Sequence, residues 1–322
     1  MLQTDWKTSL NTPILHHYPA SLFSEKIRTL LGYLRLDWQS VIIPAIMPRP
    51  ALMPLSGGYR KTPIMQIGAN VYCDTEIICR KLAELGENDT LYAPGYAPGF
   101  AAERIARWAD TELFRTTVAL NFRPEALATQ MSQLTEAEIE AFQKDRAELS
   151  GGAPIVGVDP GSAQADFCAL LAGLEGSLSD QEYLLGTAPS IADFSLYHCL
   201  WFVSNNPANR SLFEPWPAVQ AYLDRMQAFG HGNVEEVSAE QALAIGTDAT
   251  PVSPTAEIDE HLAGALNIGD TVTVAPNDYG RIPVTGRLVA HTSTEIVIER
   301  EDDTAGEIMV HFPNIGFDLS AV

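Results

Sequence analysis

Hydrophobic positions in the first 86 residues change their period several times, and each change marks an expected element. Residues 12–18 alternate as a short strand does, and an apolar stripe at helical spacing follows over 24–36. A second strand, a hairpin around Gly68 and a helix stopped by Gly86 complete the series. The expected elements are a strand over 12–18, a helix over 24–36, a strand over 38–43, a hairpin over 63–67 and 70–73, and a helix over 74–85. This order predicts a mixed sheet with helices on its faces.

The stretch 44–60 interrupts this pattern with four prolines and the pair Gly57-Gly58. Because proline lacks a backbone N–H and restricts its neighbours, we expect a long loop without a regular helix here.

The region 100–230 is mostly helical in pattern, and 102–114 is its strongest helix. A linker rich in glycine and proline, 87–100, separates it from the first unit. A second such stretch, 150–162, lacks the Gly-Lys-Ser/Thr of a phosphate loop and is expected to be a plain loop between helices. We therefore expect an α/β domain over 12–86 and an all-helical domain over 100–230.

Beyond residue 230 the pattern changes again. A polar connector, 234–266, leads into four segments in which apolar residues alternate with period two, separated by turn residues. These segments are 268–274, 284–288, 295–299 and 307–312. We expect residues 262–322 to form a small all-β barrel of the SH3-like kind, which folds autonomously and takes no part in the binding pocket.

The formal net charge of −21 disfavours nucleic acid as a partner, because a phosphate backbone would be repelled. Residues 231–322 contain 16 acidic and 3 basic side chains, so the acidity is concentrated near the C-terminus. A solvated surface is the simpler interpretation, and a docking face for a protein partner is the alternative.

Hydrophobic content of 46% indicates a globular protein with a substantial core, and the sequence has no apolar run long enough for a membrane helix. Residues 1–6 lack the basic start of a secretory signal, so we expect a cytoplasmic protein. The four cysteines form no Cys-x-x-Cys motif and no zinc spacing with histidines, which predicts buried thiols and no metal site.

Four short motifs in fixed order carry the strongest functional signal. They are Ser21-Leu22-Phe23-Ser24-Glu25-Lys26-Ile27-Arg28, Lys61-Thr62-Pro63-Ile64, Asp74-Thr75-Glu76-Ile77-Ile78 and Ser190-Ile191-Ala192-Asp193-Phe194. Together they resemble the glutathione S-transferase superfamily over residues 12–230. The resemblance implies a thioredoxin-like N-terminal domain, an all-helical domain and glutathione as co-substrate. The motif at 190–193 is a capping box that stabilises a core helix in this family.

The resemblance places Ser21 at the catalytic position, where the first strand turns into the first helix. A hydroxyl that donates a hydrogen bond to sulfur favours the thiolate, and the positive end of the helix dipole adds to this effect. Ser21 can also cap the helix, and the two roles are compatible. Tyr18 is the alternative hydroxyl donor, whereas His16 and His17 lie inside the strand and are expected to be structural.

The same resemblance implies a glutathione site. Thr62, before a proline that suits a cis bond, would pair by its main chain with the cysteinyl part of glutathione. Asp74 would hold the γ-glutamyl ammonium, and Thr75 the γ-glutamyl carboxylate. The implied glutathione-binding residues are Thr62, Pro63, Asp74, Thr75, Arg60 and Lys61, the last two as partners of the glycyl carboxylate.

A second-substrate pocket normally lies against the first helix of the helical domain in this family. Trp108, Glu112 and Arg115 are the candidates, because helical spacing puts them on one face.

Three functions remain in competition. The first is a glutathione transferase, expected as a homodimer, that activates the thiol for attack on a small-molecule electrophile. The second is a non-catalytic binding or scaffold protein that docks a partner through its acidic C-terminal β domain. The third, a thiol–disulfide reductase, would need a cysteine where this chain has Ser21.

Overall fold

The computed structural model describes residues 12–92, 97–132, 134–151, 158–262, 264 and 266–322. The expectation about a secretory signal concerns residues 1–6, which lie outside the described residues. Parts of the predicted linker and of the predicted inter-helix loop, 93–96 and 152–157, also lie outside them.

The N-terminal unit has the predicted order of elements. They are β1 (Ile14–His17), α1 (Leu22–Leu34), β2 (Asp37–Ile42), α2 (Leu52–Ser56), β3 (Ile64–Ile67), β4 (Asn70–Cys73) and α3 (Thr75–Leu85). Strand β1 pairs in parallel with β2 and antiparallel with β3, which continues into the β3–β4 hairpin. This arrangement is the thioredoxin-like fold.

The short helix α2 corrects the expectation of a loop without regular helix over 44–60. Its proline, Pro54, lies in the first turn. A proline there removes no helical hydrogen bond, because the first N–H groups of a helix have no intrahelical acceptor.

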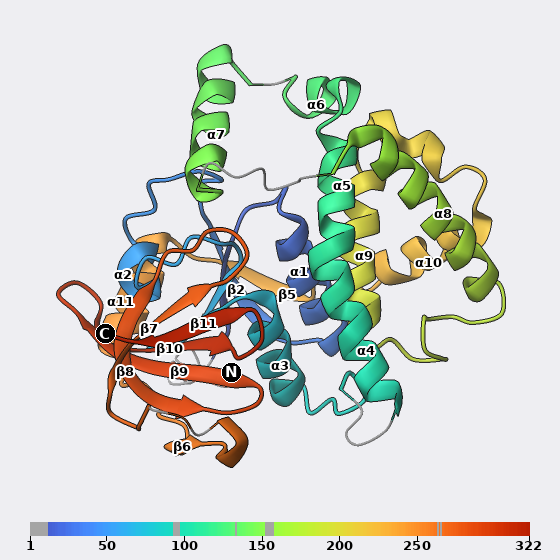
Figure 1. The fold of residues 1–322 in the computed structure, drawn as a ribbon. Coiled ribbons are helices and arrows are strands. Elements are labelled where there is room, and N and C mark those ends of the chain that lie inside the picture. Colours follow the sequence, from blue (N-terminus) through green and yellow to red (C-terminus); the bar gives the residue numbers. More distant parts are fainter. Residues whose placement is uncertain (1–11, 93–96, 133, 152–157, 263, 265) are drawn as a thin grey trace, which may run out of the picture.

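The middle of the chain forms the predicted helical domain. Its helices are α4 (Ala97–Trp108), α5 (Phe114–Asn121), α6 (Pro124–Gln130), α7 (Glu136–Leu149), α8 (Pro160–Leu178), α9 (Ile191–Ser204) and α10 (Pro217–Gln227), with a π-helical turn at Ala109–Leu113 and a 3₁₀ turn at Pro207–Leu212. Helix α9 is buried over most of its length and begins at the capping box of Ser190 and Asp193. Figure 1 shows α7 standing apart from the bundle, above the N-terminal unit. None of the described helices is long and apolar enough to cross a membrane.

The C-terminal region forms the four strands that the alternating pattern predicts and a fifth, β11, that it does not. Its elements are β5 (Asn233–Glu236), α11 (Ala239–Asp248), β6 (Glu257–Ile258), a 3₁₀ turn at Glu260–Leu262, β7 (Thr271–Pro276), β8 (Val284–His291), β9 (Glu295–Asp302), β10 (Gly306–Pro313) and β11 (Phe317–Ala321). The order β11-β7-β8-β9-β10 is the strand order of an SH3-like barrel. Strand β5, which the sequence did not predict, pairs with β2.

These C-terminal strands pair directly with the N-terminal unit, and their autonomous folding stays a prediction. Strand β10 pairs in parallel with β4, where Val310 is opposite Val71, and all strands belong to one sheet. The ring of Tyr59 lies 6.1 Å from that of Phe312. Without β10, β4 would expose an unpaired edge, which explains physically why the two regions join. In Figure 1 the orange and red strands accordingly lie beside the blue N-terminal elements.

The sheet separates two hydrophobic layers, because successive side chains on a strand point to opposite faces. On β1, Leu15 packs with α1, α3 and the helical bundle, whereas Ile14 packs with α2, α11 and the C-terminal strands. The second layer thus contains residues from both ends of the chain, which ties the C-terminal region to the sheet that carries the candidate site.

Candidate functional site

Two cavities adjoin at the edge between the N-terminal unit and the helical domain. The first has a volume of about 130 Å³ and the second of about 520 Å³. Their walls share Phe23, Lys61, Thr62 and Tyr279. A ligand that passes over these four residues can therefore reach both cavities.

The first cavity contains the residues predicted for the glutamyl end of glutathione. Thr62, Pro63, Asp74 and Thr75 all line it, and the Thr62–Pro63 peptide bond is cis, as anticipated. Thr75 is the first residue of α3, so its backbone N–H lies at the positive end of the helix dipole. This end of the cavity is suited to a carboxylate.

Asp74 has a backbone conformation, with φ 99°, that residues other than glycine rarely adopt. Its carboxylate caps α3 by accepting the N–H of Glu76 at 2.9 Å. Burial raises the pKa of the Asp74 carboxyl, and the positive charge of Lys61 only partly opposes this. A strained, half-buried acid whose charge lacks full compensation is typical of a ligand site, and a ligand ammonium would supply that compensation.

Ser21 and Tyr18 both line the second cavity, so the structure keeps both candidates for thiol activation at the site. Ser21 is the N-cap of α1, and its Oγ accepts the N–H of Ser24 at 3.2 Å. This bond occupies a lone pair of Oγ and leaves the hydroxyl proton for another acceptor. Ser21 can thus cap the helix and donate to a thiolate at the same time.

His16 and His17 are structural, as predicted from their position inside the first strand. Both are buried, and their side chains bond to Gln66 and Ser40, respectively. Burial lowers the pKa of His16 to about 4, and burial together with the charge of Arg28 lowers that of His17 to about 3. Both imidazoles are therefore neutral at physiological pH.

The two basic residues predicted for the glycyl carboxylate already have acidic partners. Arg60 Nη2 lies 2.6 Å from Asp145 Oδ1, and Lys61 Nζ lies 2.5 Å from Asp278 Oδ1. The ring of Tyr279 also lies 4.2 Å from Lys61 Nζ. A ligand carboxylate must share these cations with the protein's own carboxylates.

The residues predicted for the second-substrate pocket lie elsewhere. Trp108, Glu112 and Arg115 are all exposed, and none lines either cavity. Each of the three is turned to solvent, as suits the charged Glu112 and Arg115. Phe114 and Val118 of α5 instead form part of the cavity wall.

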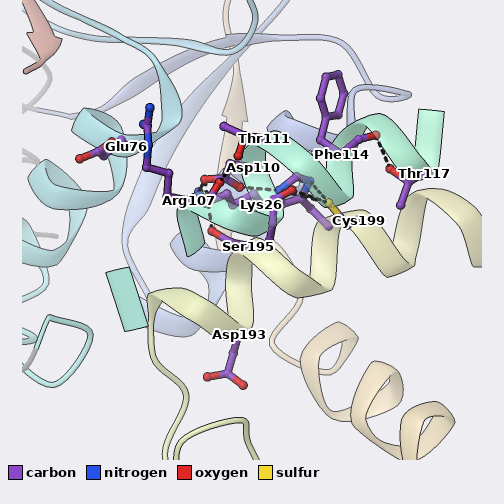
Figure 2. A network of polar contacts seen from close by, with 12 residues as sticks. Lys26, Glu76, Arg107, Asp110, Thr111, Phe114, Thr117, Asp193, Ser195 and Cys199 are labelled. Carbon is purple, nitrogen blue, oxygen red and sulfur yellow. Dashed lines mark hydrogen bonds and ion pairs between the residues drawn. The ribbon is translucent and has the colours of Figure 1, made fainter. Parts of the chain in front are cut away.

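A largely buried polar network in the wall of the first cavity, which Lys26 and Asp110 both line, was not predicted from the sequence. Lys26, only 1% exposed, places Nζ 2.7 Å from Asp110 Oδ2, and His198 Nε2 lies 2.9 Å from Asp110 Oδ1 (Figure 2). Burial alone would lower the pKa of Lys26, but Asp110 raises it, so the lysine stays charged. One signal was available: Lys26 precedes Leu30 by four positions and thus lies on the apolar stripe of α1.

A second unpredicted contribution comes from the C-terminal region. Asp278 and Tyr279, in the turn between β7 and β8, line the first cavity, and Tyr279 also lines the second. The expectation that this region takes no part in the pocket is therefore wrong. Its alternating pattern predicts strands but says nothing about where the turns between them lie.

The described residues include no group of three or more histidine, cysteine or acidic side chains that could hold a metal ion. Burial raises the pKa of Cys79 to about 12 and those of Cys73 and Cys199 well above the usual value. These three thiols therefore stay protonated and are poor nucleophiles.

Comparisons with known proteins agree with this architecture. A family model described as glutathione S-transferase, N-terminal domain, matches residues 15–89, and one described as glutathione S-transferase, C-terminal domain, matches residues 132–225. A solved GST-like protein from Pseudomonas syringae is 36% identical, with a TM-score of 0.78, and the match covers 97% of this chain and 100% of that one. The search of curated proteins found no match.

Two more distant structures are also similar. A glutathione S-transferase from Rhodospirillum rubrum is 17% identical with a TM-score of 0.49, over 67% of this chain and 88% of that one. A theta class glutathione S-transferase from Xanthomonas axonopodis pv. citri, solved with glutathione bound, is 20% identical with a TM-score of 0.47, over 67% and 93%.

The fold, with a thioredoxin-like sheet followed by a helical bundle, is the two-domain architecture of the glutathione transferases. On the strength of the Pseudomonas syringae relative and the two family models, the chain belongs to the glutathione S-transferase superfamily.

Proposed function

We propose that this protein binds glutathione in the first cavity and activates its thiol for attack on an electrophilic small molecule in the second. One observation carries the proposal: the two cavities adjoin at Thr62, with Asp74 and Thr75 in one and Ser21 in the other. The order of these residues, from Asp74 and Thr75 past Thr62 to Ser21, matches the order of groups in the tripeptide from its glutamyl end to its thiol.

The glutamyl group would be bound by opposite charges. The N–H and hydroxyl of Thr75, at the N-terminus of α3, are suited to its carboxylate. The Asp74 carboxylate is suited to its ammonium, which would offset the cost of keeping that half-buried acid ionised. Thr62 would pair with the cysteinyl backbone.

The thiol would be activated by hydrogen bonding. A free cysteine thiol has a pKa of about 8.5, so little thiolate exists at neutral pH. A hydrogen bond from the Ser21 hydroxyl and the dipole of α1 both stabilise the anion and lower that pKa. The thiolate sulfur then attacks the electrophile, and the thiol proton is released to solvent.

Calorimetric titration with glutathione tests the first half of the proposal. Asp74→Ala should weaken binding by about 1–3 kcal/mol, the cost of leaving a charged partner without its bond. Asp180→Ala, at an exposed acid that lines neither cavity, is the matched control and should bind as the wild type does. A wild-type protein that gives no heat with millimolar glutathione would favour the scaffold function instead.

The ultraviolet absorbance of the bound thiolate, followed against pH, tests the second half. Ser21→Ala should leave glutathione affinity nearly unchanged and raise the pKa of the bound thiol. If that pKa does not move while Tyr18→Phe raises it, the tyrosine is the donor.

A homodimer and a cytoplasmic location are part of the same proposal, and both follow from family resemblance. Light scattering on the purified chain would decide the oligomeric state, and a monomer that turns over glutathione would remove the dimer from the proposal.

A further inference from the structure

The second cavity combines apolar walls with a concentration of positive charge. Phe114, Phe122 and Phe142 are among its apolar residues. Among the described residues, its charged lining side chains are those of Arg49, Arg60, Lys61 and Arg146, and none is an aspartate or glutamate. This is unexpected in a chain with a net charge of −21, so the local charge is a property of the cavity and not of the composition.

Arg60 and Arg146 share one carboxylate. Asp145 Oδ1 lies 2.6 Å from Arg60 Nη2, and Asp145 Oδ2 lies 2.7 Å from Arg146 Nη2. The backbone N–H of Met47 also donates to Asp145 Oδ1, at 3.0 Å. Two guanidinium groups and one carboxylate leave a net charge of +1. The Asp145 carboxylate also uses part of its remaining hydrogen-bond accepting capacity for the Met47 N–H.

Arg146 retains hydrogen-bonding capacity. Among the described residues, its Nε is buried and has no hydrogen-bond partner. Its guanidinium lies 5.2 Å from the centre of the Phe142 ring, which places charge and aromatic surface side by side. Because hydrogen bonds between charged groups are strong, an anionic group that accepts from another N–H of this guanidinium would be bound favourably.

Arg49 has a different role, because it positions the loop around the cluster. Its guanidinium donates to the carbonyl oxygens of residues 44, 45 and 60 and to Thr62 Oγ1 at 2.9–3.1 Å. Arg146 Nη2 donates to the carbonyl of Ala45 at 2.6 Å, which holds α7 against the same loop. The arginine pair is therefore held on a fixed frame at one side of the cavity.

We propose that the second substrate is an electrophile with an apolar ring and a carboxylate, whose anion is bound by Arg146 and Arg60. The inference rests on the proposed function and names the substrate class of its second cavity. A volume of about 520 Å³ admits a substituted ring, and a hydrogen bond from a guanidinium to a carboxylate is stronger than one between neutral groups. With a chloroarene, the sulfur–carbon bond forms as the carbon–chlorine bond breaks, chloride leaves, and the thiol proton goes to solvent.

Two matched probe pairs test this substrate class. Chlorodinitrobenzoate and chlorodinitrobenzene differ by one carboxylate and serve for turnover, whereas dinitrobenzoate and dinitrobenzene cannot lose chloride and serve for calorimetric binding. Dinitrobenzoate should bind the wild type about tenfold to a hundredfold more tightly than dinitrobenzene, as expected for hydrogen bonds to a charged group. Chlorodinitrobenzoate should show the higher kcat/KM.

Arg146→Gln should abolish the preference for the benzoate in both pairs while glutathione affinity stays unchanged. Arg210→Gln, at an exposed arginine that lines neither cavity, is the matched control and should keep the preference. If Arg146→Gln does not fold, Arg146→Lys keeps the charge without the planar fork and should reduce the preference in part.

Three outcomes overturn the inference. Equal wild-type affinity for dinitrobenzoate and dinitrobenzene would remove the anion site. Loss of glutathione affinity in Arg146→Gln would assign the arginine pair to the glycyl carboxylate. An unchanged preference in Arg146→Gln would assign the anion to another group. Turnover of neither chloroarene alongside tight dinitrobenzoate binding would instead refute the proposed function and support the anion site alone.

Discussion

Phe312→Ala tests whether the C-terminal strands and the glutathione-site domain form one cooperative unit. Phe312 is fully buried on β10, with its ring centre 6.1 Å from that of Tyr59 and 5.4 Å from that of Phe317. Truncating such a side chain costs about 3–5 kcal/mol, because transfer free energy is lost and a cavity remains. A native domain is stable by only about 5–15 kcal/mol, so the effect should be large.

Urea unfolding followed by tryptophan fluorescence measures the effect of this substitution on the part of the chain before residue 230. All five tryptophans precede residue 230, and Trp38 is buried on β2, in the N-terminal part of the sheet. Because β10 pairs with β4 in that sheet, Phe312→Ala should lower the urea concentration at the midpoint of the tryptophan transition. The urea concentration at which glutathione binding is lost should fall by the same amount. Val252→Ala, at an exposed apolar residue, is the control and should change stability by less than about 0.5 kcal/mol.

The opposite result is equally clear. If Phe312→Ala leaves the tryptophan midpoint unchanged and only adds a separate early transition by circular dichroism, the C-terminal strands unfold on their own and the shared sheet is not a cooperative unit. If the alanine variant is insoluble, Phe312→Leu applies the same test with a smaller loss of volume.

Further predictions follow from single contacts. Asp278→Asn should tighten glutathione binding by up to about fivefold in calorimetry, because it frees Lys61 from a partly exposed ion pair; weaker binding would show that Asp278 holds the ligand. The buried neutral His17 contributes stability above pH 6.5 that is lost as the pH falls toward about 3, because the unfolded chain binds the proton first; His17→Asn should flatten that slope in urea titrations. Gly32→Ala should destabilise by about 1–3 kcal/mol, because its Cβ would lie 2.2 Å from the Gly230 carbonyl oxygen, and an unchanged melting temperature would contradict this.

Local features of the candidate site were accessible from the sequence because each belongs to one short segment. Ser21 sits at a strand–helix turn, and Asp74 opens the helix after a hairpin. Capping preference and hydrophobic period identify such positions without knowledge of the rest of the chain. The family resemblance then supplied roles, which remain predictions for Ser21, Asp74 and Thr75.

Long-range partners could not be predicted in this way. Arg60 was identified as a candidate cation, but its partner Asp145 is 85 positions away, and the Asp278 that pairs with Lys61 is 217 positions away. Hydrophobic period fixes which residues share a face and not which neighbour covers it. For the same reason Trp108 and Arg115, which were expected to face a pocket, are exposed to solvent.

The shared sheet connects the C-terminal region directly to the candidate site. Strand β10 is hydrogen-bonded to β4, and β4 leads directly into Asp74 and the N-terminus of α3. The turn after β7 places Tyr279 in the wall common to both cavities. Because the Pseudomonas syringae relative matches 97% of this chain, the match extends over most of this β region as well. Substitutions in that turn can therefore alter ligand preference while Ser21 and Asp74 stay unchanged.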